Sequence, residues 1–250
     1  MFIRKINRES ERKSTGIAEL DVLLGGGIRN GHILLLIQQE NVRYHIGIHR
    51  IFISNGLQEN DKVIHLSMDN PILSIPSADA APSKSTSCSP KERIAWRYST
   101  VSKISNTSAI TSHTLYNMRV QHPKHNEVTN IQEIKDLQIN DKNTRLSISS
   151  FMSPLWDMTE NDANNFFLSL RQKVRSTNSV CIISVPVYLL QDIMYGYFDY
   201  IVELSEPVEG LKYDGVLQCI KTETHDRHKY GVVCSSTGIR IEKIVLPPEA

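Results

Sequence analysis

The amino-acid sequence predicts an α/β fold with a central, mostly parallel sheet followed by an antiparallel extension. Two observations carry this prediction. Short apolar runs alternate with segments of helical periodicity through most of the chain, and the last part consists of strand-like runs separated by turn residues. Alternating strands and helices build parallel sheets, whereas consecutive strands joined by short turns pair antiparallel. The 250 residues, 40% of them hydrophobic, suffice for the core of one domain.

The first elements follow a small-residue start at residues 14–16. Apolar residues at helical spacing over 17–24 predict a short amphipathic helix, and the three glycines 25–27 end it. Residues 33–37 are all apolar and predict a buried strand.

The next two elements complete a βαβ unit. Apolar residues recur at helical intervals from Tyr44 to Phe52, and Asn55-Gly56 is expected to end this helix. Residues 62–66 then predict a second strand, which should be parallel to the first and reached by a right-handed crossover.

The second half of the chain repeats this alternation before the pattern changes. A short strand at 146–148 precedes a helix that is N-capped within 159–161 and has Phe166, Phe167, Leu170 and Val174 on one face. A buried strand follows at 180–185. The remaining strands are predicted at 200–204, 215–220, 231–233 and 239–244.

We expect residues 1–13 to form a flexible N-terminal tail and residues 14–250 a single domain, with a polar, basic insertion at about 71–143. Seven basic residues and a single acidic one, Glu92, lie between residues 80 and 126, so this stretch has a net charge of +6. Interleaved Trp96, Tyr98 and Tyr116 suit stacking on unpaired bases beside phosphate-binding cations. Alternatively, Trp96 and Tyr98 alternate as in a strand and belong to the core or to an interface. The basic residues are Lys84, Lys91, Arg93, Arg97, Lys103, Arg119 and Lys124.

Composition excludes several other classes of protein. The four cysteines are scattered without a CxxC pair, which argues against a disulfide framework or a zinc site, and His113, His122 and His125 read as exposed loop residues. The longest apolar stretch, 180–190, is too short and too interrupted to cross a membrane, and the N-terminus lacks the apolar core of a secretion signal. We therefore expect a cytoplasmic and nuclear protein without metal.

The segment after the first buried strand lacks the motif expected of an ATPase. In RecA-like ATPases such a strand runs into GxxxxGK[ST], whose backbone N–H groups and Lys hold phosphate. Here residues 38–45 read QQENVRYH, without glycine or a Lys-Ser/Thr pair and with Glu40 where phosphate would rest. The later strand, 145–150, ends in Ser149-Ser150 rather than in the aspartate that holds Mg²⁺.

Two interpretations follow from these missing motifs. The first is a RecA-like domain that does not hydrolyse ATP by itself. The second is a divergent RecA- or KaiC-like NTPase with a cryptic nucleotide site, in which Glu40 would act as a base and Arg43 would contact phosphate. A solvated loop at a helix start explains Glu40 and Arg43 more simply, so we favour the first interpretation.

Separated sequence blocks resemble the family of Elongator complex protein 4, the fourth subunit of the Elongator tRNA-modification complex. They are STGIAELDVLLGGGIRNGHILLLIQQE at 14–40, KERIAWRY at 91–98, SPLW at 153–156, LRQKVRSTNSVCIISVPVYL at 170–189 and IVLPPE at 244–249. The blocks occur in family order and cover much of the chain. The chain is similar to the family but shorter, with trimmed stretches around 69–91 and 100–144.

The resemblance implies a RecA-like fold without working Walker motifs and a non-catalytic scaffold role. Family members form a heterohexameric ring with Elongator subunits five and six. That ring binds tRNA, hydrolyses ATP as an assembly and docks onto the catalytic subcomplex that modifies wobble uridine, U34. This chain alone would then bind no cofactor, any ATP would sit at ring interfaces, and the chain would supply elements in trans, much as an arginine finger does.

The resemblance and the basic insertion together assign candidate residues. Those expected to contact tRNA are Lys91, Arg93, Arg97, Arg119 and Lys124. Those expected to serve the fold or an interface are Gly25, Gly26, Gly27, Trp96, Tyr98 and Trp156. No catalytic or metal-binding residue is assigned.

Overall fold

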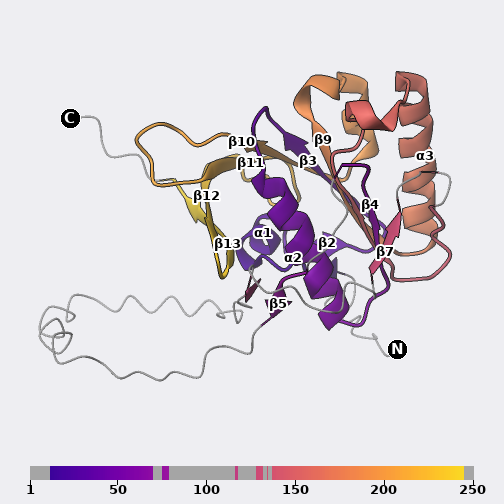
Figure 1. Cartoon of the computed structure of the whole chain (residues 1–250), viewed down its shortest axis with the longest axis horizontal. Helices are drawn as coiled ribbons and strands as arrows, with labels where there is room; N and C mark the ends of the chain where they lie inside the picture. Colours follow the sequence, from indigo (N-terminus) through magenta and orange to yellow (C-terminus); the bar gives the residue numbers. More distant parts are fainter. Residues whose placement is uncertain are drawn as a thin grey trace, which may run out of the picture.

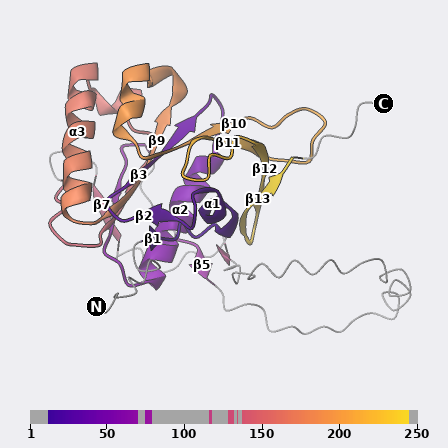
Figure 2. The same ribbon diagram turned by 180° about the vertical axis from the view of Figure 1, so that it is seen from behind.

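The computed structural model describes residues 12–69, 75–78, 116–117, 128–131, 134 and 137–244. These residues build one large mixed sheet covered by helices on both faces (Figures 1 and 2). The α/β class predicted from the sequence is confirmed, and the layers agree with a RecA-like domain. Among the described residues this sheet has nine strands, which are in spatial order β13 (Gly238–Lys243), β12 (Lys229–Ser235), β11 (Gly215–Lys221), β10 (Tyr200–Ser205), β3 (Ile33–Gln38), β9 (Val180–Pro186), β8 (Arg145–Ile148), β4 (Val63–Leu66) and β7 (Val128–Ile131).

Strand direction divides the sheet as the sequence pattern indicated. Every neighbouring pair from β10 to β7 is parallel, and every pair from β10 to β13 is antiparallel. The strands β3 and β4 of the predicted βαβ unit are parallel but not adjacent, because β9 and β8 lie between them. The C-terminal ends of the parallel strands therefore share one edge of the sheet, which is where α/β proteins bind their ligands.

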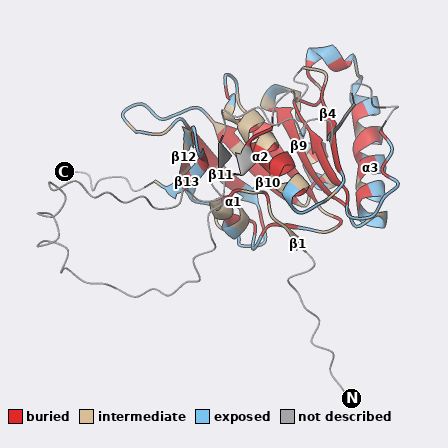
Figure 3. Cartoon of the chain, turned by 60° about the horizontal axis from the view of Figure 1, so that its bottom comes forward, coloured by how far each residue is buried: buried red, intermediate tan, exposed pale blue. Residues whose placement is uncertain are grey.

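Helices α1 (Ala18–Leu23) and α2 (Tyr44–Gln58) cover one face of the sheet, and α3 (Glu160–Ser176) covers the other. Strand β3 is buried on both faces: Leu34 and Leu36 pack with α1 and α2, whereas Leu35 packs with α3. Figure 3 shows the buried residues in the strands and on the inner sides of the helices. A central strand of this kind must be apolar throughout, which explains the uninterrupted run at 33–37.

Helix α3 forms where its cap and apolar face predicted it. Thr159 is the N-cap, and it forms a capping box with Asp162. The apolar face Phe166, Phe167, Leu170 and Val174 is buried against the sheet, as expected.

Helix α2 does not end at Asn55-Gly56, contrary to the sequence prediction. It continues to Gln58, and Asn60, with a φ of 57°, supplies the left-handed residue after its end. Gly56 lies within the helix, where a Cβ atom would be 2.5 Å from Cδ of Arg145. The glycine therefore serves close packing and not the helix cap.

The described structure begins slightly before the predicted boundary at residue 14. Arg12 and Lys13 form strand β1 (Arg12–Lys13), which pairs antiparallel with β2 (Ile28–Arg29). Arg12 forms an ion pair with Glu223 at 2.5 Å, and Lys13 forms one with Asp61 at 2.8 Å. Residues 1–11 of the expected tail lie outside the described residues. None of the described helices is long and apolar enough to cross a membrane.

Candidate functional site

The connection between β3 and α2 occupies the position of a P-loop. It consists of residues 39–43, and two of its backbone N–H groups bond to carbonyls of the protein itself. The N–H of Gln39 donates to the carbonyl of Leu204, and the N–H of Val42 donates to the carbonyl of Gln39. Asn41 adopts a left-handed φ of 62°, and the Val42 side chain is buried in the core. A P-loop offers such N–H groups to phosphate, whereas this turn uses two of them within the protein.

Side chains fasten this turn to the end of β10. Gln39 Nε2 donates to Glu203 at 2.6 Å, and Asn41 Nδ2 donates to Glu206 at 2.9 Å. Glu40 is exposed beside them. The carboxylates place negative charge where a nucleotide triphosphate would require positive charge.

Tyr44 and His45 open α2 at the positions that the P-loop lysine and Ser/Thr would occupy, counted from Gln38. The Tyr44 hydroxyl donates to the carbonyl of Val216 at 2.7 Å, and burial raises its pKa. Its ring lies so close to Gly215 that a Cβ there would be 2.2 Å from Cε1. The side chain at the lysine position therefore holds the sheet extension.

The His45 imidazole is neutral and has a defined tautomer. Nδ1 donates to the carbonyl of Val42 at 3.0 Å, which leaves Nε2 to accept from the Gln38 amide at 2.8 Å. Burial lowers the pKa of His45 to about 4. The His45 ring thus joins the end of β3 to the turn through these two hydrogen bonds. It carries no charge that could attract a phosphate.

A row of buried histidines continues from His45 toward β4. The rings of His45 and His49 lie 6.4 Å apart, and those of His49 and His65 lie 6.5 Å apart. The Nδ1 atoms of His49 and His65 lie 2.8 and 3.1 Å from the Ser147 hydroxyl. Burial, and then the neighbouring imidazoles, lower the pKa of His49. Within the described part of the chain, no group of three or more His, Cys, Asp or Glu side chains could hold a metal ion.

Hydroxyl groups gather at the end of β8, where an ATPase would place its Mg²⁺-binding aspartate. The Ser149 hydroxyl donates to Ser67 at 2.8 Å, and the N–H of Ser150 donates to the Ser184 hydroxyl at 2.9 Å. The carboxylate of Asp69, which was not anticipated from the sequence, follows the adjacent strand β4 and accepts from the Ser153 hydroxyl at 2.8 Å. Asp69 lies just beyond the predicted strand at 62–66, and this position was the feature of the sequence that could have indicated it.

Trp156 anchors the turn that follows β8. It closes the 3₁₀ turn Pro154–Trp156, is 8% exposed, and donates from Nε1 to the carbonyl of Ser150 at 2.9 Å. Its ring contacts Phe151, with ring centroids 4.9 Å apart. Ser150, Met152 and Asp157 all have left-handed φ values in this turn, so buried packing supports an unusual backbone.

The glycine triplet lies at the opposite edge of the sheet. Gly25, Gly26 and Gly27 have φ values of 86°, 106° and 98°, and the N–H groups of Gly26 and Gly27 both donate to the carbonyl of Asp21. A Cβ on Gly27 would lie 2.5 Å from the carbonyl oxygen of Lys13. These glycines shape the tight turn between α1 and β2 and are remote from the P-loop position.

A short two-stranded ribbon carries the basic insertion. Strand β5 (Ser77–Ala78) pairs antiparallel with β6 (Tyr116–Asn117), which places Ala78 beside Tyr116. The Ser54 hydroxyl donates to the carbonyl of Pro76 at 2.6 Å, and Ile75 packs with Ile53 and Val63. The ribbon therefore sits at the C-terminal half of α2 (Figure 1). Seven predicted residues lie outside the described residues: Lys91, Arg93, Trp96, Arg97, Tyr98, Arg119 and Lys124.

Comparison with known proteins finds a family match at the N-terminal half of the chain. The family model described as PAXNEB protein matches residues 11–122. Over these residues the chain is similar to the PAXNEB family. It is also similar to Elongator complex protein 4 of Dictyostelium discoideum, with 25% identity over 246 aligned positions that cover 70% of this chain and 56% of the relative. The chain thus spans little more than half the length of that relative, and the resemblance seen in the sequence blocks is confirmed.

The PAXNEB match includes both features described above. It includes β1, the turn at the P-loop position, both strands of the ribbon and residues 79–115 between them. The altered nucleotide position and most of the basic insertion, up to residue 122, therefore fall within the part of the chain that the family model matches.

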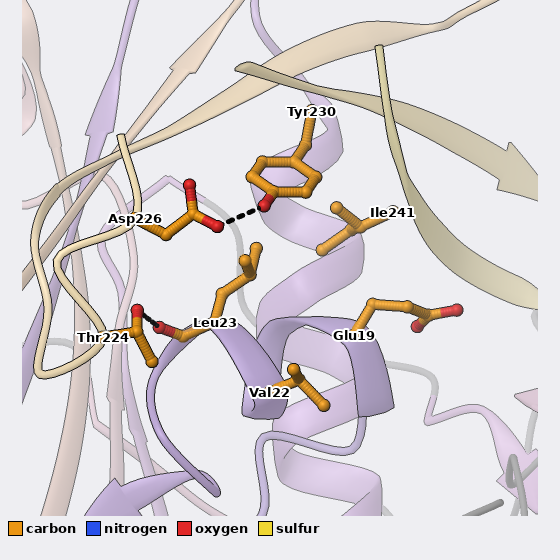
Figure 4. A pocket seen from close by; sticks show the side chains of 7 residues that line it. All are labelled: Glu19, Val22, Leu23, Thr224, Asp226, Tyr230 and Ile241. Carbon is orange, nitrogen blue, oxygen red and sulfur yellow. Dashed lines mark hydrogen bonds between the residues drawn. The ribbon is translucent and has the colours of Figure 1, made fainter. Parts of the chain in front are cut away.

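A hollow of about 340 Å³ between α1 and the β12–β13 hairpin was not anticipated from the sequence (Figure 4). The Tyr230 hydroxyl donates to Asp226 at 2.6 Å, and the Thr224 hydroxyl donates to the carbonyl of Leu23 at 2.7 Å. The bond from Tyr230, followed by those from His228, holds the pKa of Asp226 well below its usual range. The hollow is lined by Glu19, Val22, Leu23, Thr224, Asp226, Tyr230 and Ile241.

Proposed function

We propose that this chain is a non-catalytic subunit of the Elongator complex. In this proposal it forms a heterohexameric RecA-like ring with Elongator subunits five and six, and the ring binds tRNA and supports modification of U34. The similarity to Elongator complex protein 4, together with the α/β architecture, carries the proposal. In this proposal the protein is located in the cytoplasm and the nucleus, because tRNA is present in both compartments.

The turn at the P-loop position supports a non-catalytic role. Two of its N–H groups are used within the protein, and its side chains are hydrogen-bonded to the carboxylates of Glu203 and Glu206. Tyr44 and His45 stand in place of the lysine and the hydroxyl residue that reach phosphate and Mg²⁺ in a P-loop. ATP would then be bound only at interfaces to which other subunits contribute the phosphate-binding groups. A divergent NTPase with a cryptic site is the alternative that the following experiment separates.

The ribbon supports a role in RNA binding. Five of the seven basic residues of the 80–126 stretch lie within the excursion 79–115, which is tied to the body at β5 and β6. A charged segment that is tethered at both ends can contact a large ligand while the α/β domain is held in an assembly. Cations interleaved with aromatic residues suit phosphates and unstacked bases.

The deciding experiment is size-exclusion chromatography with light scattering on this chain co-expressed with subunits five and six. ATP hydrolysis and tRNA binding are measured on the same peak and on the isolated chain. We expect a six-membered species that binds tRNA, beside an isolated chain that does not hydrolyse ATP. Hydrolysis by the isolated chain would overturn the proposal and favour the NTPase with a cryptic site.

A further inference from the structure

Acidic residues dominate the edge of the sheet at which a RecA-like ATPase binds its nucleotide. The segments that border this edge are 39–43, 67–69, 149–162 and 203–214, and together they contain nine acidic residues but only two basic ones, Arg43 and Lys212. A phosphate-rich ligand is repelled by such a surface. The acidic residues are Glu40, Asp69, Asp157, Glu160, Asp162, Glu203, Glu206, Glu209 and Asp214.

Basic residues gather at the opposite edge, around the C-terminal end of α3. Three elements meet there: the N–H of Gly31 donates to the carbonyl of Ser179, and the N–H of Asn143 donates to that of Thr177. These contacts bring the β2–β3 turn and the 140–143 loop to the last turn of α3. The exposed cations of this surface, which we call the basic face, are Arg29, Lys142, Lys173 and Arg175.

The basic face is only partly neutralised by ion pairs. Arg175 lies 3.2 Å from Asp199, and the neighbouring Asp141 is paired with Lys62. Lys142 and Lys173 have no ion-pair partner among the described residues. The dipole of α3 accounts for cations in its last turn, but Arg29 and Lys142 belong to other elements.

The basic insertion is attached at the same edge of the sheet. Helices α2 and α3 both run back from the C-terminal ends of the parallel strands, so each ends near the N-terminal edge. The β5–β6 ribbon contacts the C-terminal half of α2, whereas the basic face lies at the end of α3. Glu59, Asp61, Asp141 and Asp199 also lie at this edge, but they are paired with Arg145, Lys13, Lys62 and Arg175. Lys142 and Lys173 therefore remain as unpaired cations, among the described residues, at the edge where the ribbon is attached.

We infer that the basic face binds the phosphate backbone of the RNA that the insertion engages. The RNA then lies along the N-terminal edge of the sheet, and the acidic edge faces away from it. This inference rests on the proposed tRNA binding and adds a surface and an orientation to it. The charged groups of the face are Lys and Arg side chains, so we expect its contacts to be to phosphates, which carry no base specificity.

The test compares two double variants in the assembled complex. Lys142→Gln with Lys173→Gln removes two unpaired charges from the basic face, and Arg43→Gln with Lys212→Gln removes two charges from the acidic edge. The dissociation constant for a tRNA transcript is measured across a series of salt concentrations. Each lost phosphate contact reduces the slope of log K against log salt by about 0.7 to 0.9.

We expect the basic-face variant to bind about three- to tenfold more weakly at low salt, with a slope reduced by about one to two. The acidic-edge variant should keep the wild-type slope. Equal slopes for the basic-face variant and the wild type overturn the inference alone, provided that Lys91→Gln with Arg93→Gln still weakens binding. A wild-type complex that does not bind tRNA would overturn both this inference and the proposed function.

Discussion

The side chain of Arg145 passes directly over Gly56, where a Cβ atom would lie 2.5 Å from its Cδ. Arg145 is completely buried at the start of β8 and binds Glu59 and Asp61, each at 2.7 Å. Its third contact, 2.6 Å long, is to the carbonyl of Ser14. One guanidinium therefore ties the end of α2, the turn into β4 and the N-terminal segment together.

Replacing Gly56 with alanine should destabilise the fold even though alanine favours helices. The added methyl has no room beside Arg145, and overpacking of this kind costs about 1–3 kcal/mol, whereas the gain in helix propensity is about 1 kcal/mol. We expect a lower urea midpoint for Gly56→Ala with an unchanged m-value. The matched control is Gly196→Ala, because a Cβ at Gly196 meets nothing within 4 Å. Equal midpoints for the two variants would contradict the close approach.

Replacing Arg145 with methionine should be more damaging than replacing Lys13, although both contact Asp61. The Arg145 side chain is inaccessible and Asp61 is only 7% exposed, so removing the guanidinium leaves a buried carboxylate with a single remaining ion-pair partner, Lys13. Loss of one partner of a buried pair costs about 3–5 kcal/mol. Lys13→Met removes a partly exposed partner and should cost about 1 kcal/mol or less. Denaturant titrations of both variants decide this order, and a larger loss for Lys13→Met would refute it.

The buried histidines should make stability depend on pH below neutrality. The folded-state pKa of His45 is lowered to about 4, below its unfolded value near 6.5, because burial disfavours the charged ring. The unfolded chain therefore takes up the proton first, so the stability contribution is complete above pH 6.5 and is lost as pH falls toward 4. His49 acts in the same direction.

Urea unfolding at pH 7.5, 6 and 5 measures this dependence in a range where few carboxylates titrate. His45→Asn removes the titrating group and should flatten the fall in unfolding free energy between pH 6.5 and 5. The variant is compared with His228→Asn, since His228 is an exposed residue of the β11–β12 turn. If wild type and His45→Asn lose stability in parallel, the imidazole of His45 is not the source.

Local patterns were enough to predict most elements of the sheet and its helices. The apolar face of α3 and its N-cap are local in sequence, so the sequence predicted the face and placed the cap within 159–161. Gly56 was misread as a helix end because its reason for being glycine is Arg145, which lies far along the chain. A glycine that makes room for a distant side chain and a glycine that ends a helix look the same in sequence.

The same distinction applies to the site. The missing phosphate motif at 38–45 is contiguous, so the sequence alone revealed it. The hydrogen bonds that close this turn join residues more than 160 positions apart, Gln39 to Glu203 and Asn41 to Glu206. Those partners, like the ribbon that joins residue 78 to residue 116, depend on strand order, which periodicity does not encode.

Charge removal in the insertion gives the most direct test of RNA contact. Substituting Lys91, Arg93 and Arg97 with glutamine should weaken tRNA binding by the assembled ring and flatten its salt dependence, because each neutralised phosphate contact releases counterions. Loss of about two to three contacts reduces the slope by about 1.4 to 2.7. Ring mass is measured on the same samples, since failed assembly would weaken binding by another route. An intact ring with an unchanged slope would assign these three residues to packing between subunits, and the tethered excursion would then act as an assembly arm.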